Sequence, residues 1–141
     1  MLIVKFLFSE IFNLIMVKVS EHLENAIKFY EIGVSEYEDG KRKGNLILMR
    51  EGCEKIFHAY IEACSALIQK NGLPEPESHG GRAAILSKLG EKSLVEIGRD
   101  AFVYLHKYAY YDSEILLEEV DYSIKKVGKA INYIQRKVTK A

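Results

Sequence analysis

Apolar side chains recur every three or four positions along most of this chain, which is the spacing of one face of an α-helix. The pattern predicts a first helix that begins after Ser20 and ends in a turn at 38–44. A second helix is expected over 45–71, with Gly72 closing it. The apolar face of this second helix consists of Met49, Cys53, Ile56, Tyr60, Ala63 and Leu67.

Three further helices are predicted in the second half of the chain. A short one is expected over 82–89 and a long one over 91–112, with the Ser-Leu-Val-Glu segment 93–96 forming a capping box at its start. Asp112 and Ser113 suit the cap of the last helix. The apolar face of that helix repeats at Leu116, Val120, Ile124, Val127, Ile131, Ile134 and Val138.

No segment shows the alternation of a strand, so the chain is predicted to be all-α. Four or five amphipathic helices with short connections favour an antiparallel bundle with up-and-down topology, formed by residues 20–141. Residues 1–19 are either an amphipathic extension or an artefact of start-site choice, with translation beginning at Met16. The apolar start is too short and too often interrupted to span a bilayer, and it lacks a signal-peptide pattern. We therefore do not expect the chain to be an integral membrane protein.

Composition and cysteine content set the broad class. The 141 residues suit one domain, and 20 basic against 20 acidic residues leave no net charge to favour or exclude a nucleic-acid partner. Cys53 and Cys64 lie about 16 Å apart on one predicted helix, so they cannot form a disulfide with each other. Buried, reduced thiols indicate a reducing, cytoplasmic location. Abundant Lys and Glu with little Gln favour a thermophilic source.

Most familiar site patterns are missing from the chain. It has no phosphate-binding loop, dinucleotide fingerprint or paired cysteine motif, and Glu54 and His58 are one residue too far apart for a bundle metal site. We therefore expect neither metal nor cofactor. The segment 79–82 (His-Gly-Gly-Arg) leads into a helix. It could bind an anion through its backbone amides, but a flexible hinge is the preferred interpretation. The last predicted helix carries a strip of basic residues, Lys125, Lys129, Arg136 and Lys140. This strip could bind a phosphate backbone, but a solvent-exposed face is the preferred interpretation.

The predicted helix 91–112 has a second face beside its packing face. Its packing face consists of Leu94, Ile97, Ala101, Leu105 and Tyr108. Arg99 and His106 are seven residues apart, two turns along a line outside this face. An imidazole exchanges protons near neutral pH, and a guanidinium neutralises charge on a phosphoryl group. Together they suit metal-free RNA cleavage by the 2′-hydroxyl, although a carboxylate partner for Arg99 and a dimer contact for His106 are the alternative.

The sequence RDAFVYLHKY resembles the signature of the HEPN superfamily of helical-bundle proteins, in which Arg is followed by four to six residues and then His. Arg99, Asp100 in the typical next position, and His106 match this signature. Tyr108 is similar to the His-x-Tyr extension of toxins paired with nucleotidyltransferases. The segments EKIFHAY and LHKYAYYD resemble the archaeal PaREP-like branch more closely.

The resemblance implies one of two functions. The first is a metal-independent endoribonuclease of toxin–antitoxin or defence type that acts as a homodimer. In it, His106 would act as acid–base, Arg99 would stabilise the transition state, and Asp100 would have an orienting or polarising role. Tyr108 and Tyr110 would be accessory residues. The second is a catalytically inactive dimer that binds a partner protein, such as a nucleotidyltransferase, or a nucleotide. In either case Val95, Val103 and Tyr110 would form a strip that a second subunit covers.

Overall fold

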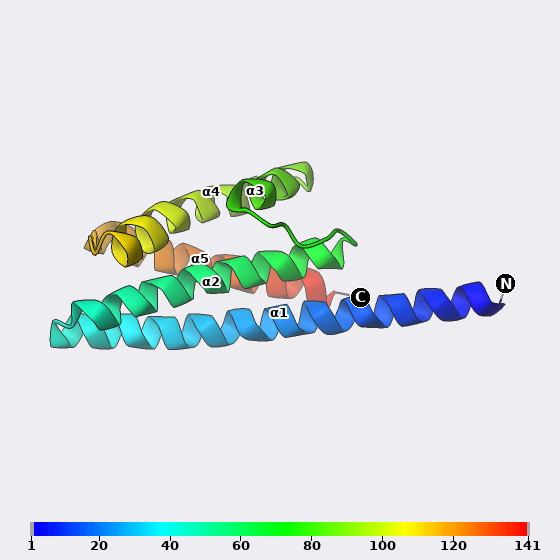
Figure 1. Cartoon of the computed structure of the whole chain (residues 1–141), viewed down its shortest axis with the longest axis horizontal. Helices are drawn as coiled ribbons and strands as arrows, with labels where there is room; N and C mark the ends of the chain where they lie inside the picture. The colour runs from blue at the N-terminus through cyan, green and yellow to red at the C-terminus, as the bar shows by residue number, and fades with distance from the viewer. Residues whose placement is uncertain (1, 141) are drawn as a thin grey trace.

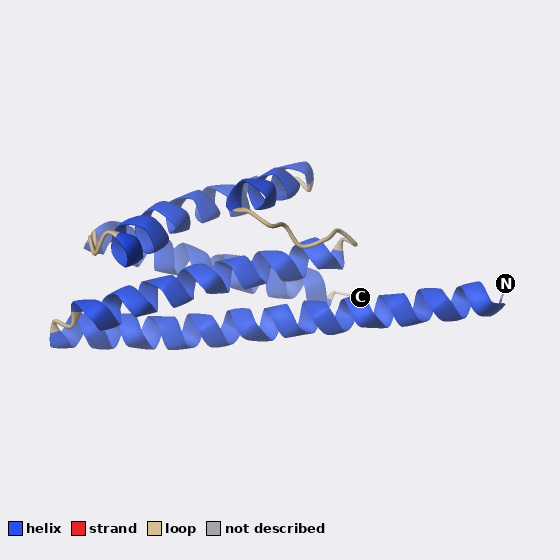
Figure 2. Cartoon of the chain, viewed as in Figure 1, coloured by secondary structure: helices blue, strands red, loops and turns tan. Residues whose placement is uncertain are grey.

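The computed structural model describes residues 2–140 as a set of long helices with short connections (Figure 1). The elements are α1 (Leu2–Lys43), α2 (Leu46–Lys70), α3 (His79–Lys88), α4 (Lys92–Ala101), the π-helix η1 (Phe102–Tyr111) and α5 (Leu117–Thr139). No strand occurs within these residues, which confirms the all-α class (Figure 2). The long segments α1, α2, α4 with η1, and α5 run in alternating directions.

Helices α1 and α2 lie antiparallel and approach each other unusually closely. A Cβ atom added to Gly33 would come within 2.8 Å of the Gly52 carbonyl oxygen. A Cβ atom on Gly52 would come within 2.6 Å of the Gly33 carbonyl oxygen and of the Tyr37 amide nitrogen. Because neither glycine has a side chain, the two backbones can touch, and α2 is held firmly against α1.

Helix α2 lies at the centre of the core and contacts α1, α3, η1 and α5. Every residue of its predicted apolar face is buried, and both cysteines on it are buried and unpaired, as expected. The predicted face of α5 is also buried from Val120 to Val138, whereas Leu116 is exposed and precedes the helix. Asn45 caps α2 through a bond from the Leu48 amide, and Gly72 follows its end with φ of 75°.

Four predicted helix ends differ from those in the structure, and two of them concern the first helix and α4. The first helix continues through the expected turn as far as Lys43, and the chain reverses at Gly44, where φ is 64°. Ser93 lies inside α4 instead of capping it; the N-cap is Glu91, whose side chain makes no cap bond. The Glu91 carboxylate instead accepts from Tyr133 and Lys137 of α5, so a tertiary contact fixes this end.

The last helix begins later than predicted. Leu116 is the N-cap of α5, and Asp112 and Ser113 belong to the preceding turn, where Ser113 adopts φ of 57°. The short helix α3 begins at His79, three residues earlier than expected, because Ser78 accepts the Gly81 amide and caps it. This earlier start places His79 and Arg82 on one helical turn.

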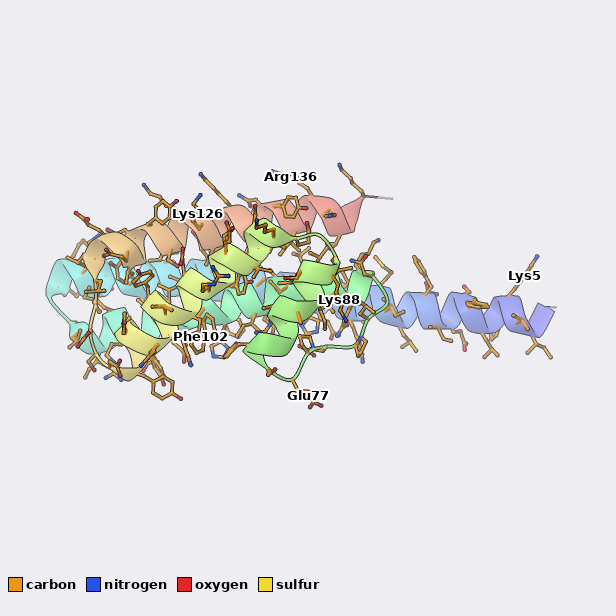
Figure 3. All side chains as sticks on the ribbon, turned by 90° about the horizontal axis from the view of Figure 1, so that it is seen from above. Lys5, Glu77, Lys88, Phe102, Lys126 and Arg136 are labelled. Carbon is orange, nitrogen blue, oxygen red and sulfur yellow. The ribbon has the colours of Figure 1, made fainter. Side chains whose placement is uncertain are left out.

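The N-terminal part of α1 projects beyond the other helices (Figures 1 and 3). The helix runs without a break through the predicted boundary at residues 19 and 20, and burial begins only at Val19. Exposed apolar side chains before it are Ile3, Val4, Phe6, Leu7, Phe8, Ile11, Phe12, Leu14 and Val17. Across the part of the chain that the structure describes, no helix combines the length and apolar character that a bilayer crossing requires.

Candidate functional site

The predicted helix 91–112 is one continuous rod whose second half is a π-helix. Ten residues, Phe102–Tyr111, adopt this wider form, in which each amide bonds the carbonyl five residues back. More residues per turn rotate the later side chains away from their α-helical positions. The buried positions are therefore Ala101, Leu105 and Ala109, while Tyr108, predicted to lie in the core, is partly exposed. Irregular helical turns of this kind occur frequently at functional sites.

His106, on η1, is hydrogen-bonded to Glu54 of α2. The His106 Nδ1 atom lies 2.8 Å from Glu54 Oε1 and 3.0 Å from Oε2. Both side chains are largely buried, at 19% and 14% exposure. A carboxylate on Nδ1 holds the proton at that nitrogen and leaves the Nε2 lone pair free to accept another. Within residues 2–140, no hydrogen bond occupies Nε2.

Aromatic rings hold the imidazole of His106 in place. The Phe57 ring stacks on it with centroids 4.8 Å apart and planes 28° apart. Tyr111 meets it edge-on at 4.9 Å, and Phe102 lies at 5.4 Å. Tyr110 is nearly parallel to it at 6.5 Å. Fixed by a carboxylate and by these rings, the imidazole has the defined orientation that proton transfer requires.

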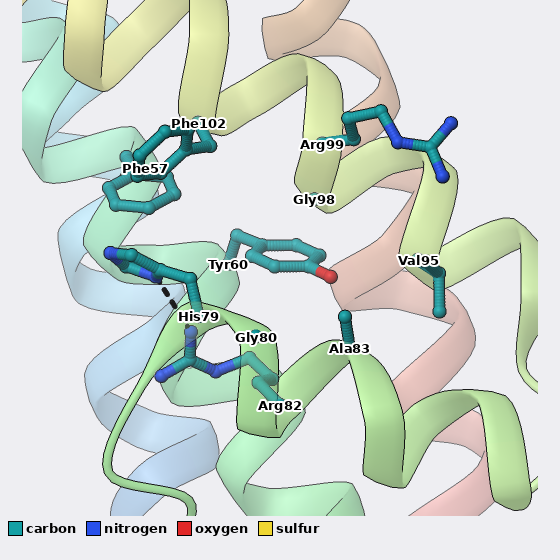
Figure 4. Close-up of a pocket in the computed structure, with 10 residues that line it drawn as sticks. All are labelled: Phe57, Tyr60, His79, Gly80, Arg82, Ala83, Val95, Gly98, Arg99 and Phe102. Atoms are coloured by element: carbon teal, nitrogen blue, oxygen red, sulfur yellow. Dashed lines mark hydrogen bonds between the residues drawn. The ribbon is translucent and has the colours of Figure 1, made fainter.

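A hollow of about 250 Å³ opens beside these rings, between α2, α3, α4 and η1 (Figure 4). Its lining consists of Phe57, Tyr60, His79, Gly80, Arg82, Ala83, Val95, Gly98, Arg99 and Phe102. A Cβ atom on Gly98 would come within 2.6 Å of Tyr60 Cζ, so this glycine lets the phenol lie against α4. The Tyr60 hydroxyl then donates to the Leu94 carbonyl at 2.6 Å, which fixes one wall.

Two basic side chains of α3 lie in the hollow. Arg82 is 8% exposed, and its Nη1 donates to His79 Nδ1 at 3.0 Å (Figure 4). Its Nε is buried without a partner. Burial, and then the charge of Arg82, lower the pKa of His79, with smaller contributions from His106 and His58. His79 is therefore neutral at pH 7 and accepts from Arg82.

Arg99 and His106, expected on one line, share Phe102 as a neighbour, which lines the hollow with Arg99 and contacts the His106 ring. Arg99 is exposed at the rim of the hollow, and its side chain extends away from the Phe57, Phe102 and His79 rings (Figure 4). His106 contacts the Phe57, His79 and Phe102 rings that line the same hollow. The alternative expectation, a carboxylate partner for Arg99, is not met among the described residues.

Asp100 does not join this group, contrary to expectation. It lines a separate hollow with Tyr104, Glu118, Glu119 and Tyr122. Asp100 follows Arg99 and is displaced from it by about 100° around the helix, so within this subunit the two side chains point in different directions. The carboxylate that orients His106 is that of Glu54.

The two tyrosines expected to be accessory are placed differently. Tyr110 lies beside His106, and its carbonyl accepts two bonds from Arg50, at 3.0 and 2.7 Å. Tyr108 instead contacts Tyr104 and Lys107. Val95, Val103 and Tyr110 are partly buried within the subunit.

Sequence reasoning missed Glu54 and Phe57 as partners of His106, and it set the segment 79–82 aside. Their i, i+3 spacing places Glu54 and Phe57 on one face of α2, but only the folded chain shows that this face meets η1. Compared with protein-family models, curated proteins and solved structures, the chain gives no match. The geometry of the site therefore carries the functional inference.

Proposed function

We propose that this chain is a HEPN-like helical protein that cleaves RNA without a metal ion, using the 2′-hydroxyl of the RNA as nucleophile. The pairing of His106 with Glu54 carries the proposal, because it gives an imidazole a fixed tautomer and a free Nε2. Histidine oriented by a carboxylate is a recurrent acid–base arrangement in enzymes. The aromatic and basic surroundings also suit the bases and phosphates of a single strand.

In the proposed reaction, Nε2 of His106 accepts the proton of the 2′-hydroxyl. The 2′-oxygen attacks the adjacent phosphorus. The bond from phosphorus to the 5′-oxygen then breaks as the His106 imidazole, now protonated, gives that oxygen a proton. The products carry a 2′,3′-cyclic phosphate and a 5′-hydroxyl. Arg99, exposed at the rim, would neutralise charge on the phosphoryl oxygens in the transition state.

We test this proposal by incubating single-stranded and structured RNA with the purified protein in the presence of a chelator. Cleavage by the intact protein that is lost in His106→Ala supports it. His22→Ala is the matched control, because His22 also pairs a part-buried Nδ1 with a carboxylate, that of Glu62. That pair lies between α1 and α2, outside the hollow, so its loss should leave cleavage unchanged. Equal loss in both variants would indicate a stability effect and contradict the role of His106.

A second function, a catalytically inactive dimer that binds a partner protein or a nucleotide, is favoured by one observation. The projecting part of α1 exposes apolar side chains on several sides, including Phe6, Phe8 and Phe12. Large exposed apolar patches mark interaction surfaces in proteins. Homodimerisation, a nucleotidyltransferase-like partner and toxin–antitoxin pairing belong to this part of the proposal.

A chain beginning at Met16 separates the two functions. It lacks the exposed apolar residues from Ile3 to Leu14, but keeps Glu54, His106 and the hollow. If the inactive-module function holds, this shorter chain loses self-association or partner binding in sedimentation velocity, and neither chain cleaves RNA. If the endoribonuclease function holds, the full chain cleaves RNA and His106→Ala does not.

A further inference from the structure

We propose that the hollow beside His106 binds a phosphate group, with Arg82 and the first turn of α3 as its anchor and Arg99 at its rim. That this phosphate belongs to the RNA substrate rests on the proposed function. Binding of a phosphate by the hollow does not itself rest on the proposed function, because the observations that support it do not involve His106.

The first observation is the uncompensated charge of Arg82. Its side chain is more than nine-tenths buried, yet among the described residues no carboxylate lies within ion-pair distance of it. Only one of its five N–H donors has a described partner, the Nδ1 atom of neutral His79, and Nε is buried without any. Buried charges in proteins are normally paired. By contrast, buried Glu91 has both Tyr133 and Lys137.

The second observation is the chemistry of the other groups that face the hollow. No carboxylate lines it. Since His79 accepts through Nδ1, its Nε2 carries a proton and is a donor. The first turn of α3, a helix of ten residues, contains no acidic side chain. Ser78 accepts the amides of Gly81 and Arg82, through Oγ and the carbonyl oxygen, which leaves the amides before them unbonded within the helix.

The position of Gly80 makes this helix end accessible. A Cβ atom on Gly80 would meet nothing within 4 Å, so a ligand can approach its backbone. Helix N-termini stabilise anions through free amides and the helix dipole. The remaining walls, from Ala83, Val95 and Phe102, are apolar, and such walls strengthen electrostatic attraction by lowering the local dielectric constant. A volume of about 250 Å³ accommodates a phosphate group and a few water molecules.

The hollow is also placed for use by the proposed reaction. The His79 and His106 rings are 5.9 Å apart, and both contact Phe57 and Phe102. A phosphate bound to Arg82 would therefore lie next to the imidazole that moves the proton. The hollow would then hold a backbone phosphate of the strand that is being cleaved.

The test is NMR titration of the intact protein with inorganic phosphate, with a mononucleotide, and with an all-2′-deoxy oligonucleotide that cannot be cleaved. We expect saturable shifts of the His79 imidazole signals. Arg82→Met should weaken binding by about tenfold or more, because it removes a charge-assisted contact. Arg136→Met, the same change on the exposed face of α5, should not.

Because Arg82→Met removes a buried side chain, a second pair of variants is needed. Gly80→Asp places a negative charge in open space at the hollow, where an acidic residue in the first turn should also favour α3. We expect Gly80→Asp to fold and lose phosphate binding, and Ser87→Asp, which adds the same charge at an exposed position of α3 outside the lining of the hollow, to bind normally. Equal binding by both, or no saturable shift with any ligand, overturns the site.

The ligand source and the proposed function are separated by the same titrations. Binding of the oligonucleotide supports a nucleic-acid phosphate, whereas binding of only phosphate or mononucleotide overturns that assignment. Repeating the titration with His106→Ala distinguishes the two proposals. If the protein binds phosphate but never cleaves RNA, the phosphate site stands and the endoribonuclease function is refuted. If it cleaves RNA but binds no phosphate, the endoribonuclease function stands and the phosphate site is refuted.

Discussion

The close contact of α1 and α2 makes Gly52→Ala the sharpest stability test. The added Cβ would lie 2.6 Å from both the Gly33 carbonyl oxygen and the Tyr37 amide nitrogen, and 3.0 Å from Tyr37 Cα. These are backbone atoms, so no rotation of a side chain relieves the clash. Normal contact distances of about 3.5 Å require the helices to separate by nearly 1 Å. That movement loosens the packing of Ile56 against α1.

The expected cost follows from two opposing effects. Overpacking a tight interface costs about 1–3 kcal/mol, and a clash with backbone belongs at the upper end. Replacing Gly by Ala within a helix returns about 1 kcal/mol. The net loss in the free energy of unfolding is therefore about 2 kcal/mol, which lowers the Tm by roughly 8 °C for a domain of this size.

Differential scanning calorimetry at matched protein concentration measures this change. Gly80→Ala is the control, because its Cβ meets nothing within 4 Å and φ is not positive there. Its Tm should stay unchanged or rise slightly. A Gly52→Ala protein as stable as the parent would refute the close approach of α1 and α2, and with it the position given to Glu54 two residues later.

Further consequences concern the buried thiols and the site. Burial, the largest cause, raises the pKa of Cys53 and of Cys64 to about 12, so neither should react with a thiol reagent at pH 8 until the protein unfolds; rapid labelling would contradict this. The pKa of His79 is lowered mainly by burial and next by Arg82, and Arg82→Met should raise it in an NMR titration. The unfolded chain binds a proton at His79 more readily than the folded protein does. The contribution of neutral His79 to the free energy of unfolding is therefore complete above about pH 6.5 and is lost as the pH falls below that value. Arg82→Met should reduce this loss; an unchanged His79 titration would refute the contact. Glu54→Gln should lower kcat for RNA cleavage at least about tenfold with little change in KM, and an unchanged kcat would remove Glu54 from the mechanism.

Local patterns predicted the helices because burial follows the 3.6-residue period wherever the backbone is regular. The apolar faces of α2 and α5 are examples, from Met49 to Leu67 and from Val120 to Val138. Helix ends were harder, because some depend on distant residues. Glu91 is held by Tyr133, 42 positions away, so the nearby Ser93 is not needed as a cap.

The site was predicted only in part, for a similar reason. Arg99 and His106 were identified from their spacing, but the π-helix changes the turn between them, and no α-helical pattern reveals that change. The partner of His106 is 52 residues away on α2, a distance at which sequence spacing carries no information. Asp100 was chosen because it occupies the typical position after the Arg in the resembling signature, but in the folded subunit it lines a different hollow.

The most direct measurement of the central claim, that His106 moves a proton from the 2′-hydroxyl of RNA, is mass spectrometry of RNA fragment ends after incubation in chelator. The account predicts 2′,3′-cyclic phosphate ends with the parent protein and with His22→Ala, and none with His106→Ala. Intact RNA with the parent protein, or the same ends with His106→Ala, would contradict it.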